Sequence, residues 1–383
     1  MSESLKYLID AVAGVALFVA LLLVFAVDYF FFSSSAGPSA NTLANVKPLG
    51  GEKRQGPAKK LKLAITKTGA FGNEKWDDMG KLLKELGEIY SNFDEISEQD
   101  LILLHEKNQL KQYDVIFLTC HPSREVDKLK EPLSQYVANG GILYASDWRY
   151  DAVAAAFPDM AVNNLVGSGN AEIVKADVVD PALREALGSN TIPLKFDLPE
   201  WKTAAFGGPR VQTLIQGKYR KYKSNVETTA PLMVKFQLDK GTVIFTSFHN
   251  EKQNSRVEKQ LLEYLVFSLV TAGIDAELSS SMDKEGFTPQ GSNLLSTPPK
   301  GKVEKKYENP RACTLRFALG FRDEGYQLRF NIKSPSGKQF TKDAYSTVIL
   351  DVENAESGSW TYTVEALNAP PNFAFRTSVG EKK

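Results

Sequence analysis

The chain is poor in the two side chains that most often bind metal ions and carry nucleophilic catalysis. It has two cysteines and three histidines among 383 residues. Cys120 and Cys313 lie far apart, which excludes a disulfide framework and a paired-cysteine zinc motif. The histidines are not at metal-ligand spacing, and no HExxH sequence is present. The sequence therefore predicts no metal site and no cofactor.

The chain also lacks an excess of charge and a phosphate-binding loop. Its 46 basic and 46 acidic residues balance, so overall electrostatics do not favour a nucleic-acid partner. The short Gly167-Ser168-Gly169 sequence lacks the GxGxxG pattern. Residues 218–223 interleave basic and aromatic side chains, which could stack on bases, but an exposed strand explains them equally well. Nucleic acid is not an expected partner.

One long uncharged run is present near the amino terminus, at residues 11–27. A helix of that length covers about 25 Å, and residues 28–32 extend it to roughly the thickness of a bilayer core. We predict a tail and transmembrane helix over residues 1–32, hence a single-pass protein of the cell membrane with the lipid bilayer as a partner. A cleaved signal peptide is the alternative, although the run is long and its flank carries only Lys6 as a basic side chain.

The orientation of this predicted span depends on few charges. Lys6 and the terminal amine lie on one side of it, and Lys47 lies on the other. A short amino-terminal tail most simply stays inside, which favours an extracytoplasmic position for the bulk of the chain. The cytoplasmic orientation stays open, because basic residues between 53 and 62 could bind anionic head groups.

The remaining chain divides by composition and periodicity. Residues 33–59 are rich in Ser, Gly, Pro and Asn and predict a flexible stalk. Residues 60–273 alternate short apolar runs with amphipathic helical segments, which predicts a three-layer α/β domain with a doubly wound, mostly parallel sheet. Residues 274–307 indicate a second linker. Residues 308–383 alternate apolar and polar side chains between turn sequences, which predicts a small all-β sandwich.

Three sequences within the α/β segment carry a resemblance: YDVIFLTCHP at 113–122, VANGGILYASD at 137–147 and GTVIFTSFHNE at 241–251. Their order and spacing resemble the class I glutamine amidotransferase-like superfamily, especially its membrane-associated and non-catalytic branches. The resemblance covers residues 60–273 and implies a flavodoxin-like fold. Active members place a nucleophilic cysteine on a sharp strand-to-helix turn, the elbow, and activate it with a late His-x-Glu pair.

The match to that pattern is partial. His249 and Glu251 match the late pair in type and position. The elbow contains Ser146 and Asp147 in place of a cysteine, and a carboxylate cannot attack an amide as a thiolate would. Cys120 follows the earlier strand, where the family builds its oxyanion loop. The resemblance therefore implies a vestigial site with no catalytic residues, formed by Cys120, Ser146, Asp147, His249 and Glu251.

The carboxy-terminal segment resembles jelly-roll modules appended to secreted proteases and other extracytoplasmic proteins. The resemblance is carried by LRFNIKSPSGKQF at 328–340 and ESGSWTYTVEA at 356–366. Such modules usually mediate protein or glycan contacts, and Trp360 is expected to be a core aromatic side chain.

These features together predict a non-enzymatic, membrane-anchored scaffold or accessory subunit that interacts with other protein subunits. Two alternatives stay open. One is a hydrolase or amidotransferase with an atypical nucleophile, built on Cys120 with His249 and Glu251. The other is a sensor that binds a small molecule in the vestigial pocket.

Overall fold

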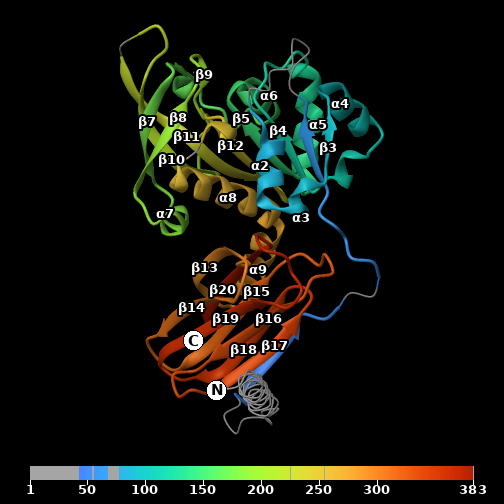
Figure 1. The fold of residues 1–383 in the computed structure, drawn as a ribbon, viewed down its shortest axis with the longest axis vertical. Helices are drawn as coiled ribbons and strands as arrows, with labels where there is room; N and C mark the ends of the chain where they lie inside the picture. Colours follow the sequence, from blue (N-terminus) through green and yellow to red (C-terminus); the bar gives the residue numbers. More distant parts are fainter. Residues whose placement is uncertain (1–42, 54–55, 68–76, 225, 254, 383) are drawn as a thin grey trace, which may run out of the picture.

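The computed structural model describes the chain except for residues 1–42, 54–55, 68–76, 225, 254 and 383. It shows an α/β domain above a β-sandwich, joined through a long helix (Figure 1). The predicted membrane segment at 1–32 lies outside the described residues. Within the described part, no helix is long and apolar enough to span a bilayer.

A nine-stranded sheet of order β3-β2-β4-β5-β12-β11-β10-β7-β8 forms the centre of the α/β domain. Its strands are β2 (Leu63–Thr66), β3 (Phe93–Ile96), β4 (Val115–Leu118), β5 (Ile142–Ser146), β7 (Glu172–Val178), β8 (Thr191–Phe196), β10 (Val211–Arg220), β11 (Glu227–Leu238) and β12 (Gly241–Thr246). Strands β3, β2, β4, β5 and β12 are parallel, and in chain order they follow the 2-1-3-4-5 arrangement of flavodoxin-like sheets.

The expectation of a mostly parallel sheet is met in only half of the sheet. Strands β11, β10, β7 and β8 continue it in antiparallel pairing. The parallel strands were recognisable because they are apolar runs buried on both faces. Strand β7 alternates buried and exposed residues, a weaker pattern in the sequence. A short pair, β6 (Ser168–Gly169) with β9 (Trp201–Lys202), lies beside the main sheet.

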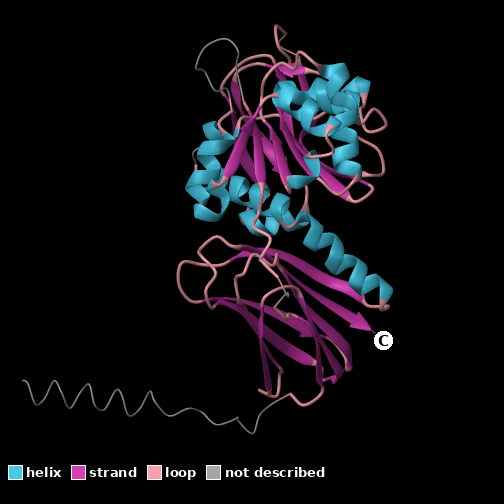
Figure 2. Cartoon of the chain, turned by 90° about the vertical axis from the view of Figure 1, so that its right-hand side faces the viewer, coloured by secondary structure: helices cyan, strands magenta, loops and turns pink. Residues whose placement is uncertain are grey.

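Helices cover both faces of the sheet, which makes three layers (Figure 2). Helices α2 (Met79–Leu86), α7 (Pro181–Leu187) and α8 (Arg256–Val270) pack on one core, and α4 (Glu98–Glu106), α5 (Val126–Ala138) and α6 (Tyr150–Ala156) pack on the other. The remaining helical turns are α3 (Glu88–Ser91), η1 (Leu110–Gln112), η2 (Asp147–Arg149), η3 (Asn163–Leu165) and η4 (Asn250–Lys252). Local sequence starts these helices: Ser255 and Glu258 form a capping box at α8.

The second domain is a β-sandwich of two sheets, β1-β18-β15-β20-β13 and β14-β19-β16-β17. Its strands are β1 (Val46–Gly50), β13 (Thr288–Ser296), β14 (Lys302–Asn309), β15 (Cys313–Gly320), β16 (Leu328–Lys333), β17 (Gln339–Ala344), β18 (Val348–Ala355), β19 (Gly358–Ala366) and β20 (Ala374–Lys382). Trp360 packs against Phe317 in its core, as the alternating pattern predicts.

Two predicted connecting segments are folded, contrary to expectation. Residues 274–307 contain most of helix α9 (Ala272–Lys284) together with strands β13 and β14. Part of the predicted stalk, 33–59, forms β1, which pairs antiparallel with β18. These strands carry few apolar side chains and are ordered by backbone pairing at the sandwich edges. The sandwich is therefore built from chain on both sides of the α/β domain.

Polar contacts join the two domains. Arg376 of β20 donates from Nε to Thr271 Oγ1 at 2.9 Å and pairs with Asp275 Oδ1 of α9 at 2.9 Å. Arg322 pairs with Asp114, just before β4, at 3.0 Å. Because Arg376 is 7% exposed, the junction has a buried polar centre that resists sliding of the domains.

Candidate functional site

Three of the predicted site residues converge at the carboxyl edge of the α/β sheet. Cys120 follows β4, Asp147 follows β5 and His249 follows β12, and these are adjacent parallel strands. The Cys120 Sγ lies 3.5 Å from Asp147 Oδ2, and His249 Nε2 lies 3.1 Å from the same oxygen. All three side chains are at most 4% exposed. We call them the Cys-Asp-His cluster.

Asp147 occupies the elbow position itself. Its φ of 47° lies in the left-handed region, which costs most residues energy and which aspartate tolerates better than most. The carboxylate is held from the far side, because Oδ1 accepts a hydrogen bond from the Lys202 backbone N–H at 2.6 Å. The sharp strand-to-helix turn is therefore present, with a carboxylate at the place where active relatives of the resembled superfamily carry a thiol.

His249 lies between two carboxylates. Its Nδ1 is 2.9 Å from Asp197 Oδ1 on one side, and its Nε2 faces Asp147 on the other. Burial by itself lowers the pKa of His249, but the hydrogen bonds to Asp147 and Asp197 outweigh it and raise that pKa well above its usual range. Both ring nitrogens then donate, so the imidazole is protonated and has no free lone pair to act as a base.

The Cys120 thiol is a poor nucleophile in this environment. Burial raises its pKa to about 11, which the hydrogen bond with His249 only partly offsets. The thiol remains protonated at neutral pH and donates to Asp147 Oδ2. Burial likewise raises the pKa of Asp147, against the opposing hydrogen bonds from His249 and Lys202.

Ser146 does not join the cluster. Its hydroxyl donates to Asp77 Oδ2 at 2.7 Å, and Asp77 Oδ1 accepts from the Asn250 backbone N–H at 3.0 Å. Asn250 also contacts the Tyr144 hydroxyl, which lies 2.7 Å from Thr246 Oγ1. Glu251 belongs to η4, but its side chain lies outside the described part of the structure. The predicted pairing of His249 with Glu251 therefore stays a prediction.

Two residues that support the cluster were missed by sequence reasoning. Asp197 follows β8, a strand that the pattern did not reveal, and Gln253 brings that strand end to His249. The Gln253 side chain accepts from Lys195 N–H at 3.0 Å and donates to Lys195 O at 2.8 Å. Neither residue belongs to a sequence motif, and their roles depend on strand pairing far apart in the chain.

Arg149 fixes the turn beneath the elbow. It is 1% exposed, donates from Nε to Thr119 O at 2.7 Å and pairs with Glu98 of α4. The arginine therefore links the segment that carries Cys120 to the segment that carries Asp147, and it holds their relative positions.

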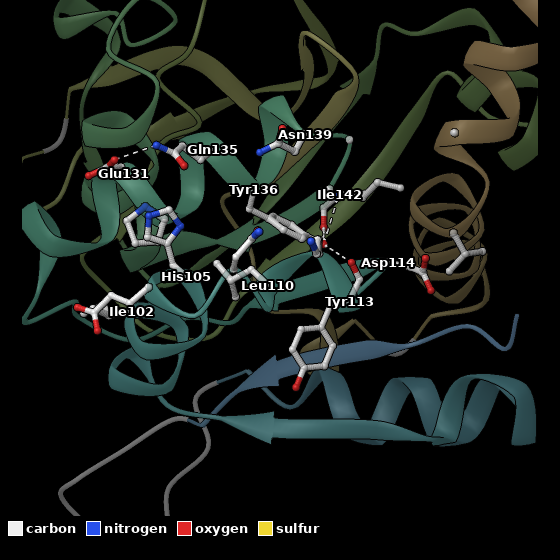
Figure 3. A pocket seen from close by; sticks show the side chains of 18 of the residues that line it. Ile102, His105, Leu110, Tyr113, Asp114, Glu131, Gln135, Tyr136, Asn139 and Ile142 are labelled. Atoms are coloured by element: carbon white, nitrogen blue, oxygen red, sulfur yellow. Dashed lines mark hydrogen bonds between the residues drawn. The ribbon is translucent and has the colours of Figure 1, made fainter.

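A cavity of about 800 Å³ lies at the opposite, amino-terminal edge of the sheet. Figure 3 shows its aromatic, amide and charged lining, which includes His105, Tyr113, Gln135 and Tyr136. None of the cluster residues lines it. The expected pocket and the expected site residues are thus at different edges of the domain.

Comparison with known proteins gives likenesses of fold. A scan of protein-family models finds no match, and neither does a search of curated proteins. Among solved structures, a putative ThuA-like protein from Bacteroides uniformis is 14% identical and covers 57% of this chain and 94% of its own, with a TM-score of 0.39. A putative GMP synthase component from Thermoplasma acidophilum is 12% identical, covering 58% of this chain and 98% of its own, at 0.37.

A β-galactosidase from Bacillus circulans is also similar, at 12% identity and a TM-score of 0.28, with 77% of this chain and 42% of its own covered. The likeness is one of fold alone. No activity passes from these proteins to this chain, so the function has to be argued from its own residues.

Proposed function

We propose that this chain is a non-catalytic, membrane-anchored scaffold or accessory subunit of a membrane-associated protein assembly. The observation that carries the proposal is the carboxylate of Asp147 at the elbow. It is buried and engaged by His249, Cys120 and the Lys202 backbone, so no activated nucleophile is present at that turn.

The state of His249 supports the same conclusion. A general base has to accept a proton from the nucleophile, and its pKa has to lie near the working pH to do so. Two carboxylates hold His249 in its protonated form. The ring therefore stabilises its neighbours and has no proton-accepting role toward Cys120.

The architecture supports a role in assembly. Strand β1, which comes next in sequence after the predicted span and part of the stalk, pairs into the sandwich. The sandwich in turn contacts the α/β domain through Arg376, Arg322 and Tyr90. A partner bound to either domain would thus be held at a defined distance from the bilayer, which we propose to be on its extracytoplasmic side.

The test is extraction of the full-length chain from membranes in mild detergent, followed by affinity purification and light-scattering chromatography. We expect a stable complex with other protein subunits, lost when residues 1–32 are removed. A full-length chain that purifies alone as a monomer would contradict the proposal. Protease accessibility in intact cells reports the orientation: protection of both domains in intact cells with cleavage only after permeabilisation would place them in the cytoplasm.

The hydrolase alternative is tested separately, because Cys120 and His249 do lie together. The chain offers a matched control in Cys313, a free and partly exposed cysteine of the sandwich. We expect a thiol reagent to label Cys313 in the native protein and Cys120 only after denaturation. Selective native labelling of Cys120 that falls in His249→Gln would support the enzyme and remove the scaffold proposal.

A further inference from the structure

The Cys-Asp-His cluster brings together three different metal-ligating side chains from three adjacent strand ends. The thiol sulfur, one carboxylate oxygen and one imidazole nitrogen all lie within 4.8 Å of one another. Thiolate, imidazole and carboxylate are the ligands that zinc takes in proteins. The residues are remote in sequence, at 120, 147 and 249, so no motif announces them.

The distances between these atoms fit the edges of a tetrahedron around one ion. Bonds of about 2.0–2.3 Å from zinc to oxygen, nitrogen and sulfur place the ligand atoms roughly 3.3–3.6 Å apart. The sulfur–oxygen and nitrogen–oxygen separations are 3.5 and 3.1 Å. An ion could enter between them with displacements of a few tenths of an ångström.

Outer groups aim the ligand atoms at one point. The Asp197 carboxylate accepts from His249 Nδ1, which turns Nε2 toward the cluster, and the Lys202 N–H holds Asp147 Oδ1, which leaves Oδ2 facing inward. A carboxylate on the far nitrogen of a histidine is the usual outer partner of a zinc-bound imidazole.

The charges also balance. Without metal, the neutral thiol, the Asp147 carboxylate and the His249 imidazolium sum to zero. Binding of Zn²⁺ releases the thiol proton and the Nε2 proton, which leaves a thiolate, a carboxylate and a neutral imidazole around a divalent cation, again summing to zero. No net charge is buried in the exchange, so the usual penalty for placing an ion in an interior is avoided.

We propose that Cys120, Asp147 and His249 bind one zinc ion, with Asp197 as the positioning residue for His249. No fourth His, Cys, Asp or Glu of the described residues completes the group, so the fourth position is left to water or an outside ligand. The ion would fasten the ends of β4, β5 and β12 to one another. This inference replaces the sequence-based expectation of no metal, and it does not depend on the proposed scaffold function.

The experiment uses the full-length chain in detergent, stripped with a chelator and titrated with Co²⁺ and then with Zn²⁺. We expect one equivalent of Co²⁺ to give visible tetrahedral bands and a thiolate-to-cobalt charge-transfer band, which Zn²⁺ then removes. Zinc binding in weak buffer at neutral pH should release about two protons per ion. Metal content and spectra are readouts that do not depend on any activity or partner.

Matched variants decide the assignment. Cys120→Ser should lose the charge-transfer band, while Cys313→Ser should keep it. His249→Gln should lose binding, while His105→Gln should match wild type. Asp197→Asn leaves all three ligands in place and should weaken zinc affinity about 10- to 100-fold. It serves if the ligand variants fail to fold.

Three results would overturn the proposal: no metal bound to the stripped, folded chain, equal affinity in wild type and Asp197→Asn, or a cobalt spectrum without the thiolate band. Loss of co-purifying subunits with the metal spectrum intact would instead contradict the scaffold function alone, so the two failures are distinguishable.

Discussion

The two edges of the nine-stranded sheet have opposite chemistry. The carboxyl edge is closed: Cys120, Asp147 and His249 satisfy one another within a few ångströms and are almost fully buried. The amino edge is open, with a cavity of about 800 Å³ and the junction to the sandwich. Both edges carry charged side chains, but only at the carboxyl edge do these depend wholly on protein partners.

This difference teaches where stability and where contact reside. A charge removed from water has to find its compensation inside the protein, so loss of one partner is costly. A charge at a partly hydrated edge keeps water as a substitute and loses little. We expect the carboxyl edge to set the stability of the α/β domain and the amino edge to set how the domains are held together.

The sharpest test removes the charge of Asp147 and keeps its shape. Asp147→Asn leaves the His249 imidazolium buried with one carboxylate partner, and we expect a loss of about 3–5 kcal/mol in the free energy of unfolding. Urea denaturation followed by circular dichroism measures it. The control is Asp343→Asn in the exposed pair with Arg329, which should cost less than about 1 kcal/mol. Equal losses would remove the contrast between buried and hydrated charge.

The domain junction should show a smaller effect. Arg376→Met keeps much of the side-chain length and removes the contacts to Thr271 and Asp275, which should cost about 1.5–3 kcal/mol. We also expect faster proteolysis between the domains. Lys305→Met removes an exposed pair with Glu185 across the same junction and should change stability by less than about 1 kcal/mol. Comparable effects would mean that burial does not matter there.

The dependence of stability on pH tests the state of His249. Its pKa is raised in the folded protein, so above about pH 6.5 the folded state retains a proton that the unfolded state releases. The contribution is fully present below that pH and is lost as pH rises, by at most about 1.4 kcal/mol per pH unit. Chelated wild type should lose stability between pH 7 and 9 relative to His249→Gln. Parallel curves would show that the ring is neutral when folded.

The smallest predicted effect concerns one neutral hydrogen bond at the junction. Tyr90 lies in α3 and donates from its hydroxyl to Asn372 O of the sandwich at 2.7 Å. Tyr90→Phe keeps the ring contact with Phe267 and should cost about 1 kcal/mol. Thermal unfolding detects this as a modest fall in Tm. A loss as large as that of Asp147→Asn would show that the junction dominates stability.

Much of the α/β fold follows from local pattern. Buried runs such as 115–119 and 142–145 mark parallel strands, and the turn at Lys240-Gly241 marks the β11–β12 hairpin that the structure contains. Strands β7 and β8 escaped recognition because one face of each is exposed. Strands β1 and β13 escaped because cross-strand backbone pairing orders them, which a local sequence window cannot reveal.

The site divides in the same way. Cys120, Asp147 and His249 were identifiable because each directly follows a recognisable parallel strand, and the carboxyl ends of such strands meet at one edge. Asp197 and Arg149 were not, because the positions that make them partners depend on β8 and on the packing of α4.

The sequence by itself determined the alternation of layers, the address suggested by residues 11–27, and the replacement of the elbow cysteine by Asp147, since each depends on residue type and local spacing. Only the tertiary structure decided that the carboxylate faces a thiol and an imidazole, that Asp197 closes the other side of the ring, and that β1 belongs to the sandwich. Those relations join residues up to 306 positions apart in the chain. Their energies come from burial and distance, which arise only when the chain has folded.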